Sequence, residues 1–443
     1  MSQSTSALPR RILVLGGGYV GLYAALRLQR KLRTGEAMIT VVDPRSYMTY
    51  QPFLPEAAAG SLEPRHVVVS LRRVLRSVDV VNGRVSSLDH AGRSATVMTQ
   101  AGTTVDIGYD VLVVALGSVV RTLPIPGLAE VGMGFKQVEE AISLRNHVLD
   151  QLDFAHSTHD PVLRRRALTF VVVGGGYAGV EALAELEDLT RYATRYYADL
   201  EPSDLRWVLV EATGRILPEV GEDMGRYTVE QLRRRTIDVR LETRLESCVG
   251  GRVVLDDGTE LDSATLVWTA GVKAHPVLAL TDLPLDERGR VRCRADLSIE
   301  GAPGAFAAGD CAAVPDLTGG PGATCAPNAQ HAVRQAKVLA DNVLATMRGE
   351  PLEDYEHKYV GSVASLGLHK GVAQVYGIKL KGWLAWFMHR TYHVSRVPTL
   401  NRKIRVIADW TLALFFRRDV VSLGRLADPR GEFRRATAPP PER

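Results

Sequence analysis

Two segments decide the fold of this chain: RILVLGGGYVGLYAALRL at residues 11–28 and LTFVVVGGGYAGVEALAEL at residues 168–186. Each runs from a short β-branched stretch through a GxGxxG turn into an Ala- and Leu-rich stretch of helical character. This order of strand, glycine turn and helix is the context that a Rossmann dinucleotide-binding loop requires. The repeat therefore predicts an α/β protein with two Rossmann-like dinucleotide-binding domains.

Within each copy the three glycines have different expected tasks. The first permits the tight turn, the second lets the backbone approach a diphosphate, and the third lets the helix pack on the strand. The diphosphate would then lie at the helix N-terminus, where free N–H groups favour an anion. The predicted loop residues are Gly16, Gly18 and Gly21 in the first copy and Gly174, Gly176 and Gly179 in the second.

An acidic residue is expected at the end of the next strand of each copy, where it can accept hydrogen bonds from a ribose diol. MITVVD ends at Asp43, and RWVLVE ends at Glu211. A carboxylate at Glu211 would repel a 2′-phosphate, which favours NADH over NADPH, although the nearby Arg215 could soften this preference.

Further strand ends support two nucleotide sites. DVLVVALGS (110–118) and TLVWTAGV (265–272) each end in a small-residue turn, at Gly117 and Gly271. GAFAAGDCA (304–312) ends in Gly309-Asp310, whose acid can bind a polyol hydroxyl of a flavin; alone, this motif would be read as an ordinary turn. Two nucleotide sites are explained most simply by a tightly held flavin and a diffusing nicotinamide that passes a hydride to it.

Composition narrows the class further. The chain has 46% hydrophobic and 23% charged residues, which is typical of a globular protein and excludes a disordered chain or a multi-span membrane protein. Four cysteines without a CxxC pair disfavour a disulfide framework, and the histidines show no metal-ligand spacing, so no metal is predicted. The apolar run 12–26 is interrupted by glycines and too short to span a bilayer.

The basic residues are unevenly distributed. The whole chain has a net charge of +4, yet Lys379–Arg418 holds nine Lys or Arg residues, one acid (Asp409) and three of the five tryptophans. This tract divides at Pro398. Its second half places Ile404, Ile407, Trp410 and Leu414 on one helical stripe among cations, which predicts an amphipathic region lying on an anionic membrane surface. The alternatives are packing on the chain's own domain or on a second subunit in a homodimer; so apolar a tract disfavours nucleic acid.

Because they carry these motifs, residues 10–348 resemble the two-dinucleotide-binding flavoproteins of the glutathione-reductase-like fold. The resemblance implies that the first glycine loop and the Gly309-Asp310 motif hold FAD and that the second loop holds NAD(P)H. It divides the chain into an FAD-binding domain at residues 10–124 and 273–348, an NADH-binding domain at 125–272, and a C-terminal quinone- and membrane-associating region with a disordered tail at 349–443.

Three regions resemble type II NADH dehydrogenases in particular. The loop YMTYQPFLPEAAAGSLEP (47–64) lacks the CxxC of disulfide reductases, AQHAVRQ (329–335) fits an AQxAxxQ quinone motif, and the C-terminal tract is similar to the family's membrane-binding end. Two departures are Asp43, where Glu is common, and YAGVE, where PTGVE is common.

The resemblance suggests three residues for quinone chemistry. Gln330 and Gln335 would bind quinone carbonyls; without the resemblance they would be read as exposed helix glutamines. Glu181 would orient the nicotinamide amide or relay a proton to the quinone, and the alternative is a carboxylate that only favours the helix dipole.

These inferences predict a peripheral enzyme on the cytoplasmic, inner face of the cell membrane. It would pass hydride from NADH to FAD and two electrons to a membrane quinone, without pumping protons because no spanning helix is expected. The alternatives are a soluble NAD(P)H-dependent ferredoxin-type reductase of the same fold and a non-catalytic flavoprotein that senses NADH; a sulfide:quinone reductase is disfavoured by the intact second loop and Glu211.

Overall fold

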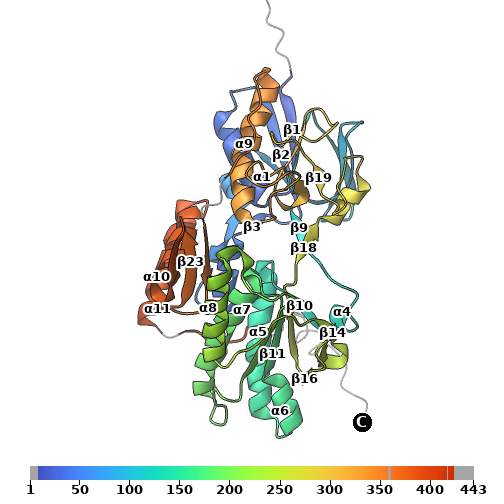
Figure 1. The fold of residues 1–443 in the computed structure, drawn as a ribbon. Coiled ribbons are helices and arrows are strands. Elements are labelled where there is room, and N and C mark those ends of the chain that lie inside the picture. The colour runs from blue at the N-terminus through green and yellow to red at the C-terminus, as the bar shows by residue number, and fades with distance from the viewer. Residues whose placement is uncertain (1–7, 358–360, 417, 424–443) are drawn as a thin grey trace, which may run out of the picture. The chain divides into compact units, whose positions relative to one another are not determined.

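The structure is a computed structural model that describes residues 8–357, 361–416 and 418–423. The chain forms two compact units (Figure 1). The first comprises residues 1–49, 68–121 and 271–359, and the second comprises residues 50–67, 122–270 and 360–443. Each unit contains one glycine loop. The four-part domain division stays a prediction, and the predicted tail beyond residue 423 lies outside the described residues.

A seven-stranded sheet forms the core of the first unit, in the order β20-β8-β1-β2-β5-β6-β7. The strands from β20 to β5 are parallel, and β6 and β7 continue the sheet as an antiparallel meander. The strands are β1 (Arg10–Leu15), β2 (Ala37–Asp43), β5 (Asp79–Asp89), β6 (Ser94–Thr99), β7 (Thr104–Gly108), β8 (Val111–Val114) and β20 (Ala305–Ala307). Every residue of β8, and also of the edge strand β20, is buried, which places this part of the sheet in the core of the unit.

Short strand pairs complete this unit: β3 (Tyr47–Thr49) with β4 (Val68–Ser70), β9 (Ser118–Val120) with β18 (Val272–Ala274), and β19 (Val291–Arg292) with β21 (Ala312–Ala313). The helices are α1 (Tyr19–Lys31), α3 (Leu71–Val74) and α9 (Ala329–Arg348).

Helices α1 and α9 lie side by side in the first unit (Figure 1). Asn328 caps α9 by accepting a hydrogen bond from the His331 N–H at 2.8 Å. The two helices are joined by Asp341 of α9, whose carboxylate binds Arg27 at 2.5 Å and Lys31 at 2.7 Å. This pairing fixes α9, which carries both candidate glutamines, against the helix of the first glycine loop.

A five-stranded parallel sheet forms the core of the second unit, in the order β10-β17-β11-β12-β13. Its strands are β10 (Gly132–Gly134), β11 (Thr169–Val173), β12 (Arg206–Val210), β13 (Asp238–Arg240) and β17 (Thr265–Trp268). A small antiparallel sheet adds β14 (Leu245–Ser247), β15 (Arg252–Leu255) and β16 (Glu260–Asp262). Strand β11 is buried along its whole length and delivers the second glycine loop.

Helices of different length accompany this sheet. They are α2 (Leu54–Ala58), α4 (Leu128–Val131), α5 (Val138–Ser157), α6 (Pro161–Ala167), α7 (Tyr177–Ala193) and α8 (Glu222–Arg234). Helix α7 follows the second glycine loop and contacts α2 and α5, and twelve of its residues are buried. It is therefore enclosed on most sides, which explains why its acidic side chains meet protein partners.

The C-terminal part of the second unit consists of an antiparallel sheet and two helices. The sheet contains β22 (Gly361–Ser365), β23 (Gly371–Val375) and β24 (Ile378–Lys381), and α10 (Gly382–Arg396) and α11 (Leu400–Phe415) follow. The two helices separate around Pro398, as the sequence predicted. Among the described residues, no helix is both long enough and apolar enough to span a bilayer.

Helices α10 and α11 leave many large apolar side chains exposed. Ile404, Ile407 and Leu414 of the predicted stripe are 57%, 49% and 74% exposed. Trp410 departs from that prediction, because its indole N–H turns inward and donates to Glu56 at 2.7 Å. The exposed residues of the two helices also include Trp383, Leu384, Phe387, Leu400, Leu412 and Phe415. The apolar stripe is therefore present, but the indole N–H of one predicted member, Trp410, is directed toward the interior of the unit.

Candidate cofactor sites and the buried face of helix α7

The first glycine loop connects β1 to α1 and tolerates no side chain at two of its positions. Gly16 has φ +106°, and a Cβ there would lie 2.3 Å from the Ala115 carbonyl oxygen. A Cβ on Gly21 would lie 1.7 Å from the Gly16 carbonyl oxygen. At Gly18, in contrast, a Cβ would meet no atom within 4 Å. Two glycines serve the fold, and the third leaves open space where a ligand can approach.

Asp43 at the end of β2 is held by the loop itself. Its Oδ2 accepts the Gly17 N–H at 2.7 Å, and its Oδ1 accepts the Arg45 N–H at 2.8 Å. Burial raises the pKa of this carboxyl above its ordinary value, while the two N–H donors oppose the shift. The carboxylate therefore has a fixed orientation beside the loop, as a ribose-binding acid requires.

Gly117 and the Gly309-Asp310 turn meet in the first unit. The hydroxyl of Ser118 donates to Asp310 Oδ2 at 2.6 Å. The Gly309 N–H donates to Gln335 Oε1 at 2.8 Å. Because Gln335 is only 1% exposed, the reading of this residue as an exposed helix glutamine is wrong. Its carbonyl oxygen instead fixes the turn, a link that neither segment suggests when read alone.

Gln330 lies one turn before Gln335 in α9 and is partly exposed. Its Oε1 accepts a hydrogen bond from Arg334 at 3.2 Å. The two glutamines thus differ: Gln335 is buried and hydrogen-bonded to the Gly309 turn, whereas the side chain of Gln330 is partly exposed.

The second loop repeats the geometry of the first. Gly174 has φ +115°, and a Cβ on Gly179 would lie 1.9 Å from the Gly174 carbonyl oxygen. A Cβ on Gly176 would meet nothing within 4 Å. Glu211 Oε2 accepts the Gly175 N–H at 2.6 Å, which matches the bond between Asp43 and Gly17.

The remaining contacts of Glu211 bear on ribose recognition. Its Oε1 accepts both the N–H and the hydroxyl of Thr213, each at 2.8 Å. Arg215 is exposed nearby. Gly271 has φ +92° and belongs to the first unit, whereas the second glycine loop belongs to the second unit.

Both loops fit the diphosphate of a dinucleotide. Gly18 and Gly176 are the N-caps of α1 and α7, and no described side chain caps either helix. The first-turn N–H groups therefore face the open space beside each loop, where an anion is favoured. Two such loops in one chain define a protein that binds two dinucleotides.

Glu181 is the fifth residue of α7 and is 5% exposed. Its Oε1 accepts the Ser365 N–H at 2.8 Å and lies 3.2 Å from His389 Nε2. These partners mean that Glu181 does more than favour the helix dipole. Gln330 and Gln335 belong to the first unit, whereas Glu181 belongs to the second.

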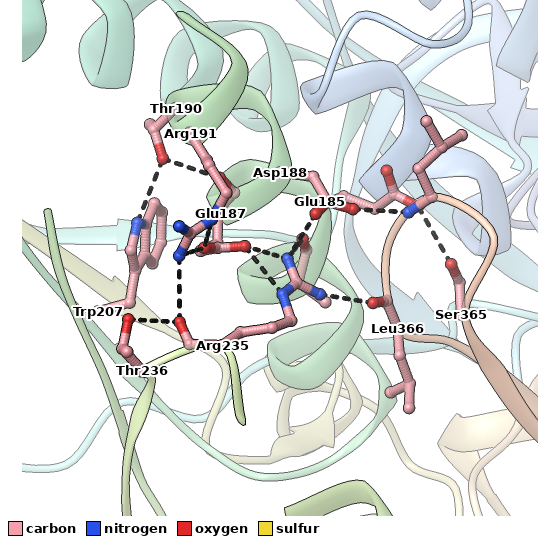
Figure 2. A network of polar contacts seen from close by, with 12 residues as sticks. Glu185, Glu187, Asp188, Thr190, Arg191, Trp207, Arg235, Thr236, Ser365 and Leu366 are labelled. Carbon is pink, nitrogen blue, oxygen red and sulfur yellow. Dashed lines mark hydrogen bonds and ion pairs between the residues drawn. The ribbon is translucent and has the colours of Figure 1, made fainter. Parts of the chain in front are cut away.

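Further acids of α7 are buried among arginines (Figure 2). The Arg235 guanidinium pairs with Glu187, donates to Asp188 at 2.8 Å and donates to the Leu366 carbonyl at 2.6 Å. Arg191 binds the other oxygen of Glu187 at 2.6 Å. This network ties α7 to the turn between β22 and β23.

A second buried cluster surrounds Arg390 of α10. Its guanidinium donates to Glu56 at 2.7 Å and lies over the rings of Trp386 and Trp410, 4.1 Å and 4.7 Å from their centroids. Arg390 is thus desolvated between two aromatic faces, where cation–π attraction adds to the ion pair. Two tryptophans of the predicted membrane tract hold the helix in place.

Glu185 lies between these clusters and is 1% exposed. Its Oε1 accepts the Ser365 hydroxyl at 3.1 Å, and Arg418 is 3.9 Å from its Oε2. Burial, with the nearby Glu56 carboxylate, raises the pKa of Glu185 to about 7. The sequence showed a helix rich in acids but not that this one would be enclosed.

Two histidines of α10 were also missed as candidate functional residues. His389 is 1% exposed, and its ring lies 4.5 Å from that of His393. Tyr50 contacts His393 Nδ1 at 3.2 Å, and the loss of water around the ring lowers the pKa of His393 well below its ordinary value. The spacing of Ala385, Trp386 and His389 could have placed His389 inside, because Ala385 and Trp386 mark the buried face.

Comparisons with known proteins agree with this architecture. Residues 10–336 match the pyridine nucleotide-disulphide oxidoreductase family. The chain is 30% identical over 433 residues to the type II NADH:quinone oxidoreductase Ndh of Mycobacterium tuberculosis (strain ATCC 25618 / H37Rv), covering 94% of this chain and 91% of that protein. It is 32% identical over 394 residues to the type II NADH:quinone oxidoreductase of Staphylococcus aureus (strain NCTC 8325 / PS 47), covering 88% and 95%.

A similar solved structure is NDH2 from Plasmodium falciparum in complex with NADH. It superposes with a TM-score of 0.84 at 18% identity and covers 93% of this chain and 99% of that one, which shows a shared fold.

The chain therefore belongs to the pyridine nucleotide-disulphide oxidoreductase family and, within it, to the type II NADH:quinone oxidoreductases. The predicted family, the α/β fold and the assignment as an oxidoreductase are confirmed. The predicted cofactors, FAD and NADH, are those of this family. Which residues of this chain hold each cofactor stays a prediction.

Proposed function

We propose that this enzyme oxidises NADH and reduces a membrane quinone through bound FAD, without moving protons across the membrane. The observation that carries the proposal is the pair of matched loops, in which Asp43 accepts the Gly17 N–H and Glu211 accepts the Gly175 N–H. Bound FAD would accept a hydride from NADH and supply two electrons to the quinone.

The first unit would hold FAD. Gly16, Gly18 and Gly21 form its diphosphate loop, and Asp43 is positioned for the ribose. The other proposed contacts are Gly117, Gly309 and Asp310. Ser118 and Gln335 hold this turn through their bonds to Asp310 and Gly309.

The second unit would hold NADH. Gly174, Gly176 and Gly179 form the loop, Glu211 accepts the ribose hydroxyls, and Gly271 is a further proposed contact. The bonds from Gly175 and Thr213 keep the Glu211 carboxylate beside the loop, where a 2′-phosphate would meet a like charge. NADH is therefore the proposed donor.

For the quinone we propose two kinds of contribution. Gln330 would offer its partly exposed side chain to a quinone carbonyl, and Gln335 would act by fixing the Gly309 turn. Glu181 would supply the proton, because its carboxylate is held by Ser365 yet is not fully enclosed.

The exposed stripe on α10 and α11 supports a peripheral position on the inner face of the membrane. Apolar side chains such as Trp383, Phe387 and Leu414 would enter the lipid, and cations such as Arg405 would meet anionic headgroups. A homodimer that covers the same stripe is the competing arrangement.

One experiment tests the function directly. The purified holoenzyme is mixed with NADH and, in parallel, a menaquinone analogue, a ubiquinone analogue and ferredoxin. We expect turnover with at least one quinone and none with ferredoxin. Turnover with ferredoxin alone would make the chain a ferredoxin-type reductase, and flavin bleaching by NADH with no reoxidation by quinone would make it an NADH sensor.

Membrane binding is tested with the same holoenzyme. Flotation with anionic liposomes should exceed flotation with neutral ones, and the double variant I404E/L414E should stay unbound while remaining folded. If that variant becomes monomeric and the wild type never floats, the stripe is a dimer surface.

A further inference from the structure

His389 is a buried ionisable side chain that the proposed function does not yet use. It lies on α10 and is 1% exposed. Neither of its ring nitrogens forms a hydrogen bond within the described residues, although Nε2 lies 3.2 Å from Glu181 Oε1. Buried polar groups are almost always hydrogen-bonded, and one that is not carries a free-energy cost. The placement of this imidazole beside a carboxylate therefore calls for an explanation.

The carboxylate of Glu181 has two different sides. Oε1 accepts the Ser365 N–H at 2.8 Å and faces His389. Oε2 forms neither a hydrogen bond nor an ion pair with a described residue, and 7% of the side chain stays exposed. The group can therefore receive a proton on Oε1 from inside the unit while it gives one up from Oε2 at the surface.

We propose that His389 holds the proton that Glu181 delivers to the quinone, which makes His389 a positioning residue for this reaction. The inference rests on the proposed function, in which NADH, a quinone and one proton from water give NAD⁺ and a quinol. As a proton leaves Oε2 of Glu181 for the quinone oxygen, the proton on His389 Nε2 passes to Oε1. Solvent then returns one proton to the imidazole.

Other charged and titratable groups surround this pair. Glu185 lies one turn further along α7, and Tyr50 and Glu56 come from the segment 50–67. His393 and Arg390 flank His389 on α10. His369, between β22 and β23, contacts Trp386 of the same helix at 4.6 Å, and Arg418 approaches Glu185. Among the described residues, Glu181 is the only acid within ion-pair distance of His389.

The test compares His389→Gln, Glu181→Gln and the double variant with a matched control, His147→Gln. His147 is a half-buried histidine of the second unit, but its Nε2 faces the Thr265 hydroxyl at 2.9 Å. Each holoenzyme is assayed with NADH and a quinone, and with NADH and ferricyanide, which takes electrons but no proton. General acid–base catalysis contributes about 10²–10⁴-fold. We therefore expect quinone kcat to fall at least tenfold in H389Q, with ferricyanide turnover within twofold of wild type.

Two further readouts separate proton transfer from packing. The double variant should lose no more quinone turnover than E181Q alone, and the solvent deuterium isotope effect on quinone kcat should change in H389Q but not in H147Q. In thermal unfolding, the shifts of E181Q and H389Q should be non-additive, because the two side chains interact directly.

The outcomes separate the two proposals. If the wild type reduces quinone and H389Q is as active as H147Q, the role proposed for His389 is wrong. The proposed function of the enzyme is then unaffected. Equal losses with quinone and ferricyanide overturn the role of His389 as well, since they indicate a packing defect. A wild type that reduces ferricyanide but no quinone overturns the proposed function, and the role of His389 fails with it.

Discussion

Helices α1 and α7 begin alike and then diverge. Both start at a glycine N-cap after a GxGxxG loop, and both loops bind an acid through the N–H of the residue after their first glycine, Gly17 or Gly175. Aligned on their glycines, Tyr23 of α1 corresponds to Glu181 of α7, and Arg27 corresponds to Glu185. The N-terminal ends of α1 and α7, where a diphosphate would bind, are alike. The side chains with which each helix packs on the rest of its unit differ.

The reason lies in what each helix packs against. Helix α1 lies beside α9, and Arg27 reaches its partner Asp341 near the surface. Helix α7 is covered by the C-terminal part of its unit, so Glu181, Glu185 and Glu187 are all buried. A buried carboxylate requires partners, and Ser365, His389 and Arg235 supply them. The second copy thus connects a nucleotide loop to the helices proposed to touch the membrane.

The largest effect is expected when the third glycine of each loop is replaced by alanine, because the two loops should then lose different nucleotides. A Cβ at Gly21 or Gly179 would lie 1.7 Å or 1.9 Å from a carbonyl oxygen, so the loop must open. We expect G21A to be purified without flavin. G179A should keep its flavin, but its visible absorbance should no longer bleach when NADH is added.

The control for both variants is Gly320→Ala, since a Cβ at Gly320 meets nothing within 4 Å. Flavin absorbance of the purified protein and stopped-flow mixing with NADH measure the outcome. Loss of flavin from G179A alone would reverse the assignment of the two loops.

The buried acids of α7 offer the next largest effect. Removing one partner of a buried ion pair costs about 3–5 kcal/mol, so R235M should lower the free energy of unfolding by that amount. Arg226, which is 66% exposed in its pairs with Glu222 and Asp223, provides the comparison. R226M should cost no more than about 1 kcal/mol. Equal losses in urea titrations of the two variants would mean that the network of Figure 2 does not stabilise α7.

Most of the fold and the positions of both glycine loops could be predicted from the sequence. The strand–turn–helix repeat locates both loops, and the β-branched run before an acid locates Asp43 and Glu211, because these patterns are local in the chain. The helix at 329–348 and the break at Pro398 are local too. All of these depend on periodicity and turn chemistry over a few residues.

The remaining site residues depend on contacts between distant segments. Gln335 reaches Gly309, 26 residues earlier, and Trp410 reaches Glu56 across 354 residues. Glu181 meets Ser365, 184 residues away. Spacing within a helix says which face a side chain occupies but not what covers that face. The inward turn of Trp410 and the pairing of His389 therefore required the structure.

A smaller effect is expected at the ribose acids. Replacing Glu211 with Ser removes the like charge that a 2′-phosphate would meet, so kcat/KM for NADPH relative to NADH should rise about 10- to 100-fold, or about 1.4–2.7 kcal/mol. The flavin content should not change, because Asp43 serves the other loop. Comparable kcat/KM values for the two nucleotides in the wild type would show that Glu211 does not select NADH.

The last expected effect concerns a pH dependence at Glu185 of α7, whose counterpart on α1 is Arg27, a residue that stays charged at all ordinary pH values. The pKa of Glu185 is raised to about 7, so the folded protein binds this proton more tightly than the unfolded chain does. Stability from this group is complete below the ordinary carboxyl pKa and is lost as pH rises toward about 7. E185Q has no such proton, and its stability relative to wild type should therefore increase between pH 5 and pH 8 by about 1–3 kcal/mol. Urea titrations across that range measure the slope, with E222Q on the exposed surface of α8 as the control. A flat difference between E185Q and wild type would mean that Arg418 and Arg390 compensate the buried charge fully, and that α7 is as insensitive to pH as its counterpart.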